Sequence, residues 1–461
     1  MSNFAGSKLK IVIVIFFSAM GGMLYGYDIG IMSGALPFIK ISLGLTPTEE
    51  SLLGGSVLFG GAFAILLGGV LADIYGRKNL IIASGLIFIV SVIMIYYAET
   101  FGFLLASRLI QGIAVGFISI TVPLYLTESV PSLIRGLAVT CFQLFLTAGI
   151  LISTAVGLLF ITTDTTTGVE TGDWRAMFLT ALIPGIIVFL GGFSLIKSPR
   201  WLIMKGKTEE AEKILATTIG SEAAKEQMKE VADLINISKS EGSLLSSLTK
   251  RHYLIPMILV FTVAILAQLT GINSILQYAP TMLKHTGLGT VYGAVMGGVA
   301  ITAINFLTTI VAVMIADKIE RKTVITFGTF MVSLVLITLS ILLYVMPDTP
   351  AKGWVLLIGF IAYIFFFAIG PGAYIWVIMS ELLPTAIRSK GLAIALFLNS
   401  MASALLASAV MPVTQYFNGN YGVILGFCGV CTLIYSFIAF KFIPKTNGLS
   451  LEEIESGFAN K

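Results

Sequence analysis

The sequence predicts an all-α membrane protein in which 12 transmembrane helices form two pseudo-symmetric six-helix bundles, with short cytoplasmic linker helices between them. Of the 461 residues, 57% are hydrophobic and only 11% are charged, a composition that excludes a soluble domain with a polar shell. Apolar runs of about 20 residues recur along the chain, each long enough to cross roughly 30 Å of hydrocarbon as a helix. Because these runs are apolar on every side, they also exclude a transmembrane β-barrel.

The first apolar run is too long for the apolar region of a signal peptide and lacks a small-residue cleavage site, so we expect it to be retained as a span. The twelve spans are expected near residues 11–37, 52–72, 80–98, 102–126, 137–161, 175–196, 254–282, 291–316, 323–346, 353–379, 391–415 and 421–443.

Two short phrases occur twice and divide the chain into halves. ADIYGRK at 72–78 returns as ADKIERK at 316–322, and TESVPSLIRG at 127–136 returns as SELLPTAIRSKG at 380–391. Both copies lie at the edges of apolar runs and keep their order. Similar halves that can rock about a central site are typical of a carrier. We therefore expect an N-terminal bundle at 1–196, cytoplasmic linker helices at 197–252, a C-terminal bundle at 253–444 and a cytoplasmic tail at 445–461.

Lysine and arginine predict the orientation of the chain. With the N-terminus inside, about 23 of the 28 basic residues fall on the cytoplasmic side and about four fall outside. We therefore expect both termini to be cytoplasmic. The net charge of +4 reflects this topology, so nucleic acid is not expected as a partner.

The polar segments between spans carry their own signals. The linker at 197–252 has Glu/Lys pairs at helical spacing, which predict two to four short helices. The loop at 162–174 is expected to be polar and flexible. In the tail, Ser450 precedes several glutamates in the manner of a helix N-cap, which predicts a short final helix.

Metal, enzymatic and ATP-driven chemistry are not expected. Cys141, Cys428 and Cys431 lie within apolar spans, and a cysteine pair one turn apart without further ligands is a poor metal site. His252 and His285 are the only histidines, and neither forms a Ser/His pair within a span. The chain also lacks a phosphate-binding Gly-x-x-x-x-Gly-Lys-Ser/Thr loop. We therefore expect a protein that is not an enzyme and needs no cofactor.

Opposite charges gather at the predicted cytoplasmic edge of both halves. Each repeated phrase brings a carboxylate near a guanidinium, and such clusters can form a latch that breaks and re-forms during transport. Positive-inside anchoring alone is the alternative explanation. The predicted latch residues are Asp73, Arg77, Glu128, Arg135, Asp317, Arg321, Glu381 and Arg388.

Six motifs occur in order along nearly the whole chain: Gly26–Gly30, Gly76–Lys78, Arg108–Gly112, Ser198–Leu202, Gln268–Asn273 and Gly370–Gly372 with Trp376. In this set the chain resembles the major facilitator superfamily, and within it the sugar porter family. The resemblance implies the fold of that superfamily and a monomeric, proton-coupled monosaccharide symporter. The compact loops, the short termini and the absence of a targeting segment predict a bacterial inner membrane as its location.

Asp28 and Arg108 are the only charges well inside apolar spans, and the topology places both in the outer half of one bundle. Isolated charges in hydrocarbon are costly, so such residues are usually paired and functional. Burial favours a neutral Asp28, whereas a nearby arginine favours the carboxylate.

A motion that separates the two would let Asp28 take up a proton, which predicts a proton-coupling switch. A permanent structural ion pair is the alternative. The resemblance favours the switch, because proton-coupled sugar porters carry Asp and Arg at these motif positions.

A sugar needs hydrogen-bonding carboxamides and an aromatic face in an otherwise apolar cavity. The spans offer both, although helix–helix hydrogen bonds are an alternative use for buried amides. By resemblance, six residues match sugar-contacting positions: Gln143, Gln268, Asn273, Asn305, Trp376 and Asn399.

The sequence departs from the family pattern near these positions. Ala267 stands where many sugar porters have Gln, and Gln277-Tyr278 stands where the family has two tyrosines. Ser400 replaces a frequent Trp, and Lys197 replaces a frequent Glu. The choice among hexoses and pentoses therefore stays open, as does a polyol such as inositol.

Proton-coupled symport of a monosaccharide by alternating access is thus the leading interpretation, with sugar and protons as partners in a lipid bilayer. A sugar facilitator and a proton-coupled polyol transporter are the alternatives. A receptor that signals without transport is disfavoured, because the linker and tail contain no signalling module.

Overall fold

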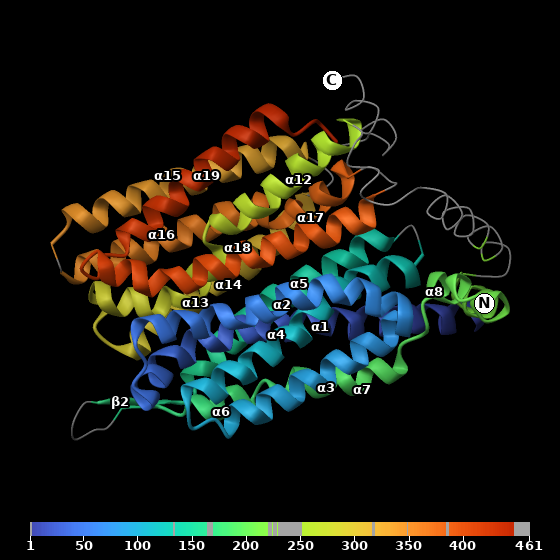
Figure 1. Ribbon diagram of the computed structural model, residues 1–461, viewed down its shortest axis with the longest axis horizontal. Helices are drawn as coiled ribbons and strands as arrows, with labels where there is room; N and C mark the ends of the chain where they lie inside the picture. Colours follow the sequence, from blue (N-terminus) through green and yellow to red (C-terminus); the bar gives the residue numbers. More distant parts are fainter. Residues whose placement is uncertain are drawn as a thin grey trace.

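The computed structural model describes residues 2–131, 134–163, 169–219, 224, 228, 251–315, 319–347, 349–383 and 387–446 (Figure 1). Within these ranges, 12 helical segments are long and apolar enough to cross a membrane, as predicted. They are Ile11–Leu43, Pro47–Tyr75, Arg77–Tyr96, Phe101–Ser129, Gly136–Leu158, Trp174–Ser194, Tyr253–Gly287, Val291–Ile315, Arg321–Val345, Pro350–Leu382, Lys390–Tyr416 and Gly422–Phe442.

The helices of the first half pack mainly with one another: α1 lies along α5, α2 along α4, and α3 against α4 and α7. Their bounds are α1 Ser2–Leu43, α2 Pro47–Tyr75, α3 Arg77–Tyr96, α4 Phe101–Ser129, α5 Arg135–Leu158, α6 Trp174–Leu179 and α7 Leu182–Ser194.

In the second half, α15 packs along α19, α12 along α18, and α14 against α16. The bounds are α12 Arg251–Leu269, α13 Ile272–Leu283, η2 Lys284–Leu288, α14 Val291–Ile315, α15 Arg321–Val345, α16 Pro350–Ile369, α17 Pro371–Leu382, α18 Arg388–Tyr416 and α19 Gly422–Phe442. The halves meet where α2 packs on α18, α5 on α14 and α1 on α13.

Two spans of the second half are broken at a glycine. The seventh span is interrupted at Gly271, whose φ of 85° lies in the left-handed region that glycine adopts without strain. The tenth span stops at Ile369 and resumes at Pro371, whose ring supplies no backbone N–H and therefore suits the first turn of α17. Irregular backbone at membrane depth is tolerated where it lines a cavity, so these breaks mark the region of a site.

The two ends of the bundle differ. The chain begins at the end where the short linker helices α8 (Pro199–Met204) and α9 (Thr208–Ile219) lie, which we call the terminal end (Figure 1). Most of the remaining linker, and the helix predicted after Ser450, fall outside the described residues.

At the other end, which we call the hairpin end, β1 (Ile161–Thr163) pairs antiparallel with β2 (Glu170–Gly172). The loop expected to be flexible therefore has paired flanks, with Thr162 opposite Thr171 at the centre of the short ladder. Glu170 then accepts hydrogen bonds from the backbone N–H groups of Val291 and Tyr292, the first residues of α14. This contact ties the hairpin of the first half to the second half.

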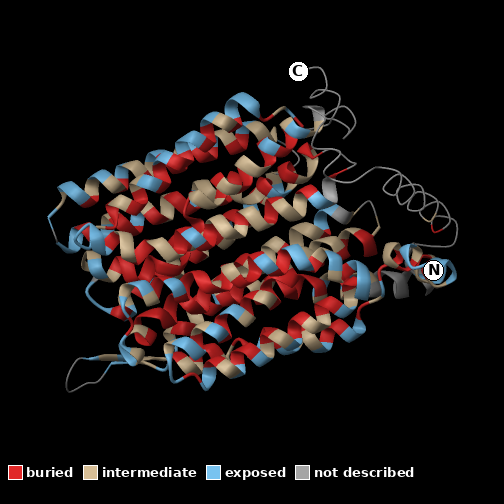
Figure 2. Ribbon diagram, viewed as in Figure 1, coloured by how far each residue is buried: buried red, intermediate tan, exposed pale blue. Residues whose placement is uncertain are grey.

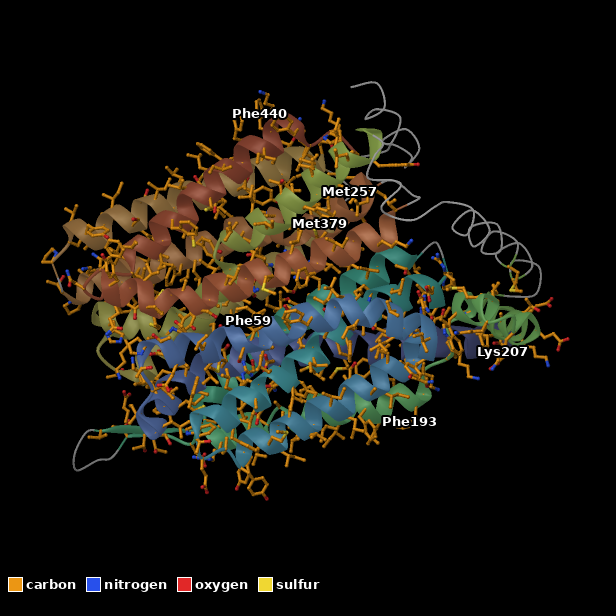
Figure 3. All side chains as sticks on the ribbon, viewed as in Figure 1. Phe59, Phe193, Lys207, Met257, Met379 and Phe440 are labelled. Atoms are coloured by element: carbon orange, nitrogen blue, oxygen red, sulfur yellow. The ribbon has the colours of Figure 1, made fainter. Side chains whose placement is uncertain are left out.

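The inner helix faces are buried (Figure 2), and many large apolar side chains are exposed along the helices. Side chains such as Phe193 on α7 and Phe440 on α19 project outward on opposite flanks, with 58% and 67% of their surfaces exposed (Figure 3). Large exposed apolar side chains along many helices suit hydrocarbon and not water. The chain is therefore a multi-pass membrane protein.

Close helix contacts depend on glycine, which gives a first prediction. A Cβ at Gly26 of α1 would overlap the backbone carbonyl of Leu146 on α5. We expect Gly26→Ala to lower the melting temperature of the purified protein by several degrees, because overpacking costs about 1–3 kcal/mol.

Gly102→Ala is the matched control, because a Cβ there meets nothing within 4 Å. It should leave the melting temperature unchanged or raise it slightly, since alanine is the better helix former. Equal melting temperatures for the two variants would show that the α1–α5 contact is not tight.

Candidate functional site

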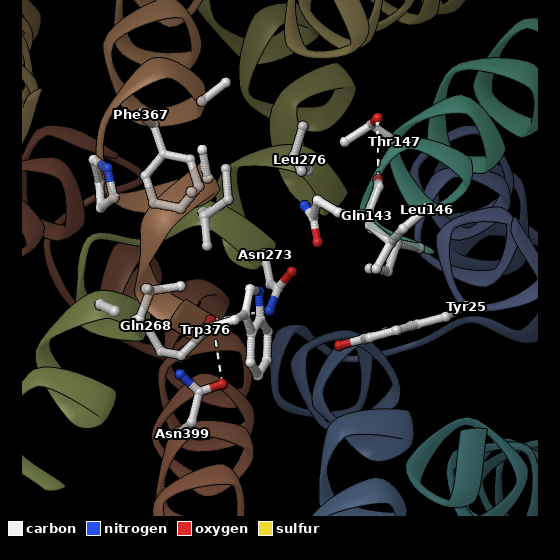
Figure 4. Close-up of a pocket in the computed structure, with 18 of the residues that line it drawn as sticks. Tyr25, Gln143, Leu146, Thr147, Gln268, Asn273, Leu276, Phe367, Trp376 and Asn399 are labelled. Carbon is white, nitrogen blue, oxygen red and sulfur yellow. Dashed lines mark hydrogen bonds between the residues drawn. The ribbon is translucent and has the colours of Figure 1, made fainter. Parts of the chain in front are cut away.

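A cavity of about 110 Å³ lies between the two halves, at the depth of the broken spans. Its walls come from α1, α2, α4 and α5 of the first half and from α12, α13, α14, α16, α17 and α18 of the second, and Figure 4 shows part of this lining. The structure brings together all six residues predicted to contact a ligand, and each lines this cavity: Gln143, Gln268, Asn273, Asn305, Trp376 and Asn399. Their role in binding stays a prediction.

Three of the carboxamides are already hydrogen-bonded to one another. Gln268 Nε2 donates to Asn399 Oδ1 at 3.1 Å, and Asn273 Nδ2 donates to Gln268 Oε1 at 3.0 Å. Asn273 Nδ2 also donates to Ser403 Oγ at 2.9 Å, and Asn399 Nδ2 donates to the carbonyl of Ala264 at 2.9 Å. Each amide retains hydrogen-bonding capacity beyond these bonds. The network therefore holds the amides in fixed directions before any ligand arrives.

The opposite wall comes from the first half. Gln143 of α5 and Tyr25 of α1 line the cavity across from Gln268 and Trp376 (Figure 4). The Trp376 indole is 38% exposed, enough to offer a ring face to a ligand. A molecule of sugar size between these walls would contact both halves at once.

Asp28 and Arg108 form a buried ion pair, as predicted, with each side chain only 2% exposed. Arg108 also donates to Gln111 Oε1 at 2.7 Å, and its guanidinium lies 5.4 Å from the centre of the Phe178 ring. The pair joins α1 to α4 within the first half. Paired and hydrogen-bonded charges of this kind can persist in a low-dielectric interior.

A smaller cavity of about 20 Å³, room for about one water molecule, adjoins this pair. Asp28, Arg108 and Gln277 line it. Tyr25 and Asn273 line both this cavity and the central one. The cavity beside the ion pair and the central cavity therefore share part of their lining.

Gln111 and Tyr25 were not among the predicted site residues. Gln111 lies three positions after Arg108 and Tyr25 three positions before Asp28, so helical spacing places each on the same helix face as the charged residue and could have indicated its role. The partner role of Ser403 carried no such signal, because serine is common in packed membrane helices.

The halves are joined by hydrogen bonds on the hairpin side of the cavity. Gln277 Nε2 on α13 donates to the carbonyl of Gly54 on α2 at 3.1 Å. The backbone N–H of Met411 on α18 donates to Ser51 Oγ on α2 at 2.9 Å. Together with the Glu170 contact to α14, these bonds close the hairpin end.

At the terminal end, those predicted latch residues that the structure describes form ion pairs within their own half. Arg77 contacts Asp73 at 2.8 Å and Glu128 at 2.9 Å, and Ser198 donates to Glu128 at 2.5 Å. Arg321 pairs with Glu381 in the second half. Asp317 and the side chains of Arg135 and Arg388 lie outside the described residues.

Outside the masked ranges, no group of three or more His, Cys, Asp or Glu residues is positioned to hold a metal ion. The arrangement has two parts, an amide-lined cavity and a buried ion pair beside it. It can bind a polar solute by hydrogen bonds, and it can hold or release a proton at the Asp28 carboxylate.

Comparisons with known proteins identify the family to which the chain is similar. Residues 14–458 match the family model described as "Sugar (and other) transporter". The chain is 32% identical over 449 residues to the D-xylose transporter of Levilactobacillus brevis, covering 97% of this chain and 96% of that protein. It is 30% identical over 459 residues to the major myo-inositol transporter of Bacillus subtilis, covering 96% and 93%.

A solved structure of the proton:xylose symporter XylE, bound to 6-bromo-6-deoxy-D-glucose, superposes with a TM-score of 0.82. The two sequences are 26% identical, and the match covers 98% of this chain and 100% of that one.

The amide network gives a second prediction. Asn399→Leu removes the acceptor for the Gln268 amide and one donor to the Ala264 carbonyl, and each lost hydrogen bond costs about 0.5–1.5 kcal/mol. We expect the melting temperature to fall by several degrees. Ser400→Ala, at the next residue of the same cavity wall, should change it little. A fall of equal size in both variants would assign the loss to helix packing and not to the network.

Proposed function

This chain belongs to the sugar transporter family, and we propose that it is a secondary active transporter that carries a monosaccharide together with protons by alternating access. It is a transporter and not an enzyme. The observation that carries the proposal is the buried Asp28–Arg108 pair beside a cavity lined with carboxamides. The likeness to a proton:xylose symporter supports the same assignment.

Proton coupling is assigned to Asp28. When the carboxylate is ionised, Arg108 neutralises it, and when it is protonated, its hold on the guanidinium weakens. Tyr25 and Asn273 line both cavities, so a sugar in the central cavity lies next to the group that binds the proton. A proton that moves down about 100 mV releases about 2.3 kcal/mol, enough for roughly fifty-fold accumulation of sugar.

Sugar binding is assigned to the six residues of the central cavity. Gln143 from the first half and Gln268, Asn273, Asn305 and Asn399 from the second supply donors and acceptors, and Trp376 offers a face for the C–H side of the ring. Because the contacts come from both halves, bound sugar would favour a closed central site.

Alternating access is assigned to rocking of the bundles 1–196 and 253–444, joined by the linker 197–252. We assign the hairpin end to the outside and the terminal end to the cytoplasm, in an inner membrane, with a monomer as the working unit. The hydrogen bonds that close the hairpin end support an inward-facing arrangement.

Opening of the hairpin end would bring the terminal ends together. There, Arg77, Glu128, Arg321 and Glu381 would exchange their partners within each half for partners across the halves. Arg135, Arg388, Asp73 and Asp317 complete this proposed latch.

A proton-coupled polyol transporter is the second candidate. Ala267 gives one side of the cavity an apolar methyl group where the family often has an amide, and Gln277 adds an amide near Asn273. The likeness to a myo-inositol transporter favours including this class in any test.

The third prediction tests coupling. Pentoses, hexoses and inositol are added singly to lightly buffered cells that express the protein, and the pH of the medium is recorded. We expect alkalinisation with one substrate or a few related ones. Asp28→Asn should abolish alkalinisation while exchange of labelled substrate continues, because the asparagine cannot take up a proton.

Glu99→Gln, which neutralises an exposed carboxylate, is the control and should behave like the unaltered protein. Equilibration of labelled substrate without any pH change would make the protein a facilitator. Exchange by none of the compounds would overturn the proposed substrate class.

The fourth prediction tests the cavity, with the substrate that gives alkalinisation. Gln268→Ala and Trp376→Ala should each raise its dissociation constant at least about tenfold, equivalent to 1.4 kcal/mol. Thr309→Val is the control, because this cavity-lining hydroxyl already donates to the carbonyl of Asn305 at 2.7 Å. Binding is measured by equilibrium dialysis, and unchanged constants in both alanine variants would remove these residues from the site.

A further inference from the structure

A second carboxylate is fully buried, away from both the cavity and the Asp28 pair. Glu50 lies in the first turn of α2 at the hairpin end, and its side chain is 0% exposed. Its Oε2 lies 2.7 Å from Nζ of Lys40 on α1, whose side chain is 38% exposed. Both charges belong to the first half.

The groups that cover this carboxylate belong to the second half. Tyr278 of α13 and Tyr421, just before α19, lie within electrostatic range of Glu50. The neighbouring Ser51 accepts the hydrogen bond from Met411 of α18. One turn further on, a Cβ at Gly54 would overlap the Tyr278 hydroxyl, so α2 and α13 are in close contact here.

Other charged and titratable groups near the pair come from both halves: the exposed Glu49 directly precedes Glu50 on α2, and η2 of the second half contributes two more. His285 and Lys284 of η2 lie within electrostatic range of one another, and His285 is in range of Lys40 as well. The His285 ring is 6.2 Å from that of Tyr421. Lys40 is thus the cation in salt-bridge contact with Glu50, and Tyr278 and Tyr421 lie within electrostatic range of the Glu50 carboxylate.

If the halves rock as the proposed function requires, the hairpin end must open, and α13, α18 and the start of α19 must leave Glu50. Water then reaches the carboxylate, and each closure must remove that water again. Desolvation of a charge is costly unless a partner compensates for it. The ion pair is therefore part of the free-energy difference between the two access states.

We propose that Lys40 and Glu50 are positioning residues of the gate at the hairpin end. Lys40 neutralises the carboxylate that the second half covers on closing, and the pair sets the equilibrium between open and closed forms of this end. This inference rests on the proposed alternating access, and it concerns residues outside the sugar and proton sites.

The two partners give opposite predictions. Lys40→Met leaves a buried carboxylate without its cation, which strongly disfavours the closed form. Glu50→Gln removes the charge that must be desolvated, and the remaining Lys40 is exposed enough to stay hydrated. A gate that depended only on packing would respond to both changes in the same direction.

The test measures the hairpin end directly, without sugar or a proton gradient. Spin labels at Glu99→Cys and Val345→Cys, in a Cys141→Ser background, report the distance between the halves in purified protein in lipid nanodiscs. Both sites are exposed, in the first and second half respectively, and the two remaining cysteines are buried.

At pH 8, Lys40→Met should raise the ratio of open to closed form at least about tenfold. Glu50→Gln should lower this ratio or leave it unchanged, and the double variant should return it to within about threefold of the unaltered protein. Glu49→Gln, at the exposed neighbouring carboxylate, is the matched control and should have no effect. A double variant as open as Lys40→Met, or single variants that shift the ratio in the same direction, would overturn the inference.

The double variant also guards against a folding defect in Lys40→Met, because Glu50→Gln would not restore the closed form of a protein that had failed to fold. Because the readout needs no transport, failure of the gate proposal is distinguishable from failure of symport.

Discussion

The structure depends above all on one constraint: a charge inside the membrane must lie against its counter-charge. Asp28 and Arg108 satisfy it within the first half, with Gln111 and the Phe178 ring around the guanidinium. This pairing stabilises both charges, and separating Asp28 from Arg108 costs free energy unless Asp28 takes up a proton. In the proposed cycle, the protonation of Asp28 therefore depends on its distance from Arg108, and movements of the other helices change that distance.

Helix α13 connects the parts that a coupled transporter must coordinate. Asn273 lines the central cavity, Gln277 borders the ion pair and bonds to Gly54, and Tyr278 covers the region of Glu50. All three side chains lie on the short helix that follows the break at Gly271. Because a break frees this helix from the first part of its span, it can move relative to α12 without distorting that helix. Cavity, proton pair and hairpin-end contacts thus share one mobile element in the proposed cycle.

Much of this was predictable from the sequence, because membrane helices are apolar enough to be recognised singly. The twelve spans, the breaks near Gly271 and Gly370, and the Asp28–Arg108 contact follow from apolar runs, glycine and rare intramembrane charge. The burial of Glu50 could not be predicted from the sequence, since Glu50 stands beside the exposed Glu49 in one helical turn. Its burial comes from the opposite half, a tertiary contact that leaves no local pattern. The paired strands Ile161–Thr163 and Glu170–Gly172 were missed because two strands of three mostly polar residues resemble a polar loop in sequence.

Coupling requires that neither the proton nor the sugar alone changes the access state efficiently. The geometry suggests how the proposed cycle meets this requirement. The amides of α12, α13 and α18 are already bonded to one another, so a sugar gains affinity mainly by bridging to Gln143 on the other half. In the proposed cycle, such bridging would hold α13 against α1, and with it Gln277, which lines the small cavity beside Asp28. An ionised Asp28 must keep Arg108 beside it, whereas a protonated Asp28 releases the guanidinium to find other partners. The sugar would therefore supply contacts between the halves and the proton would free Arg108 to rearrange, so that each needs the other.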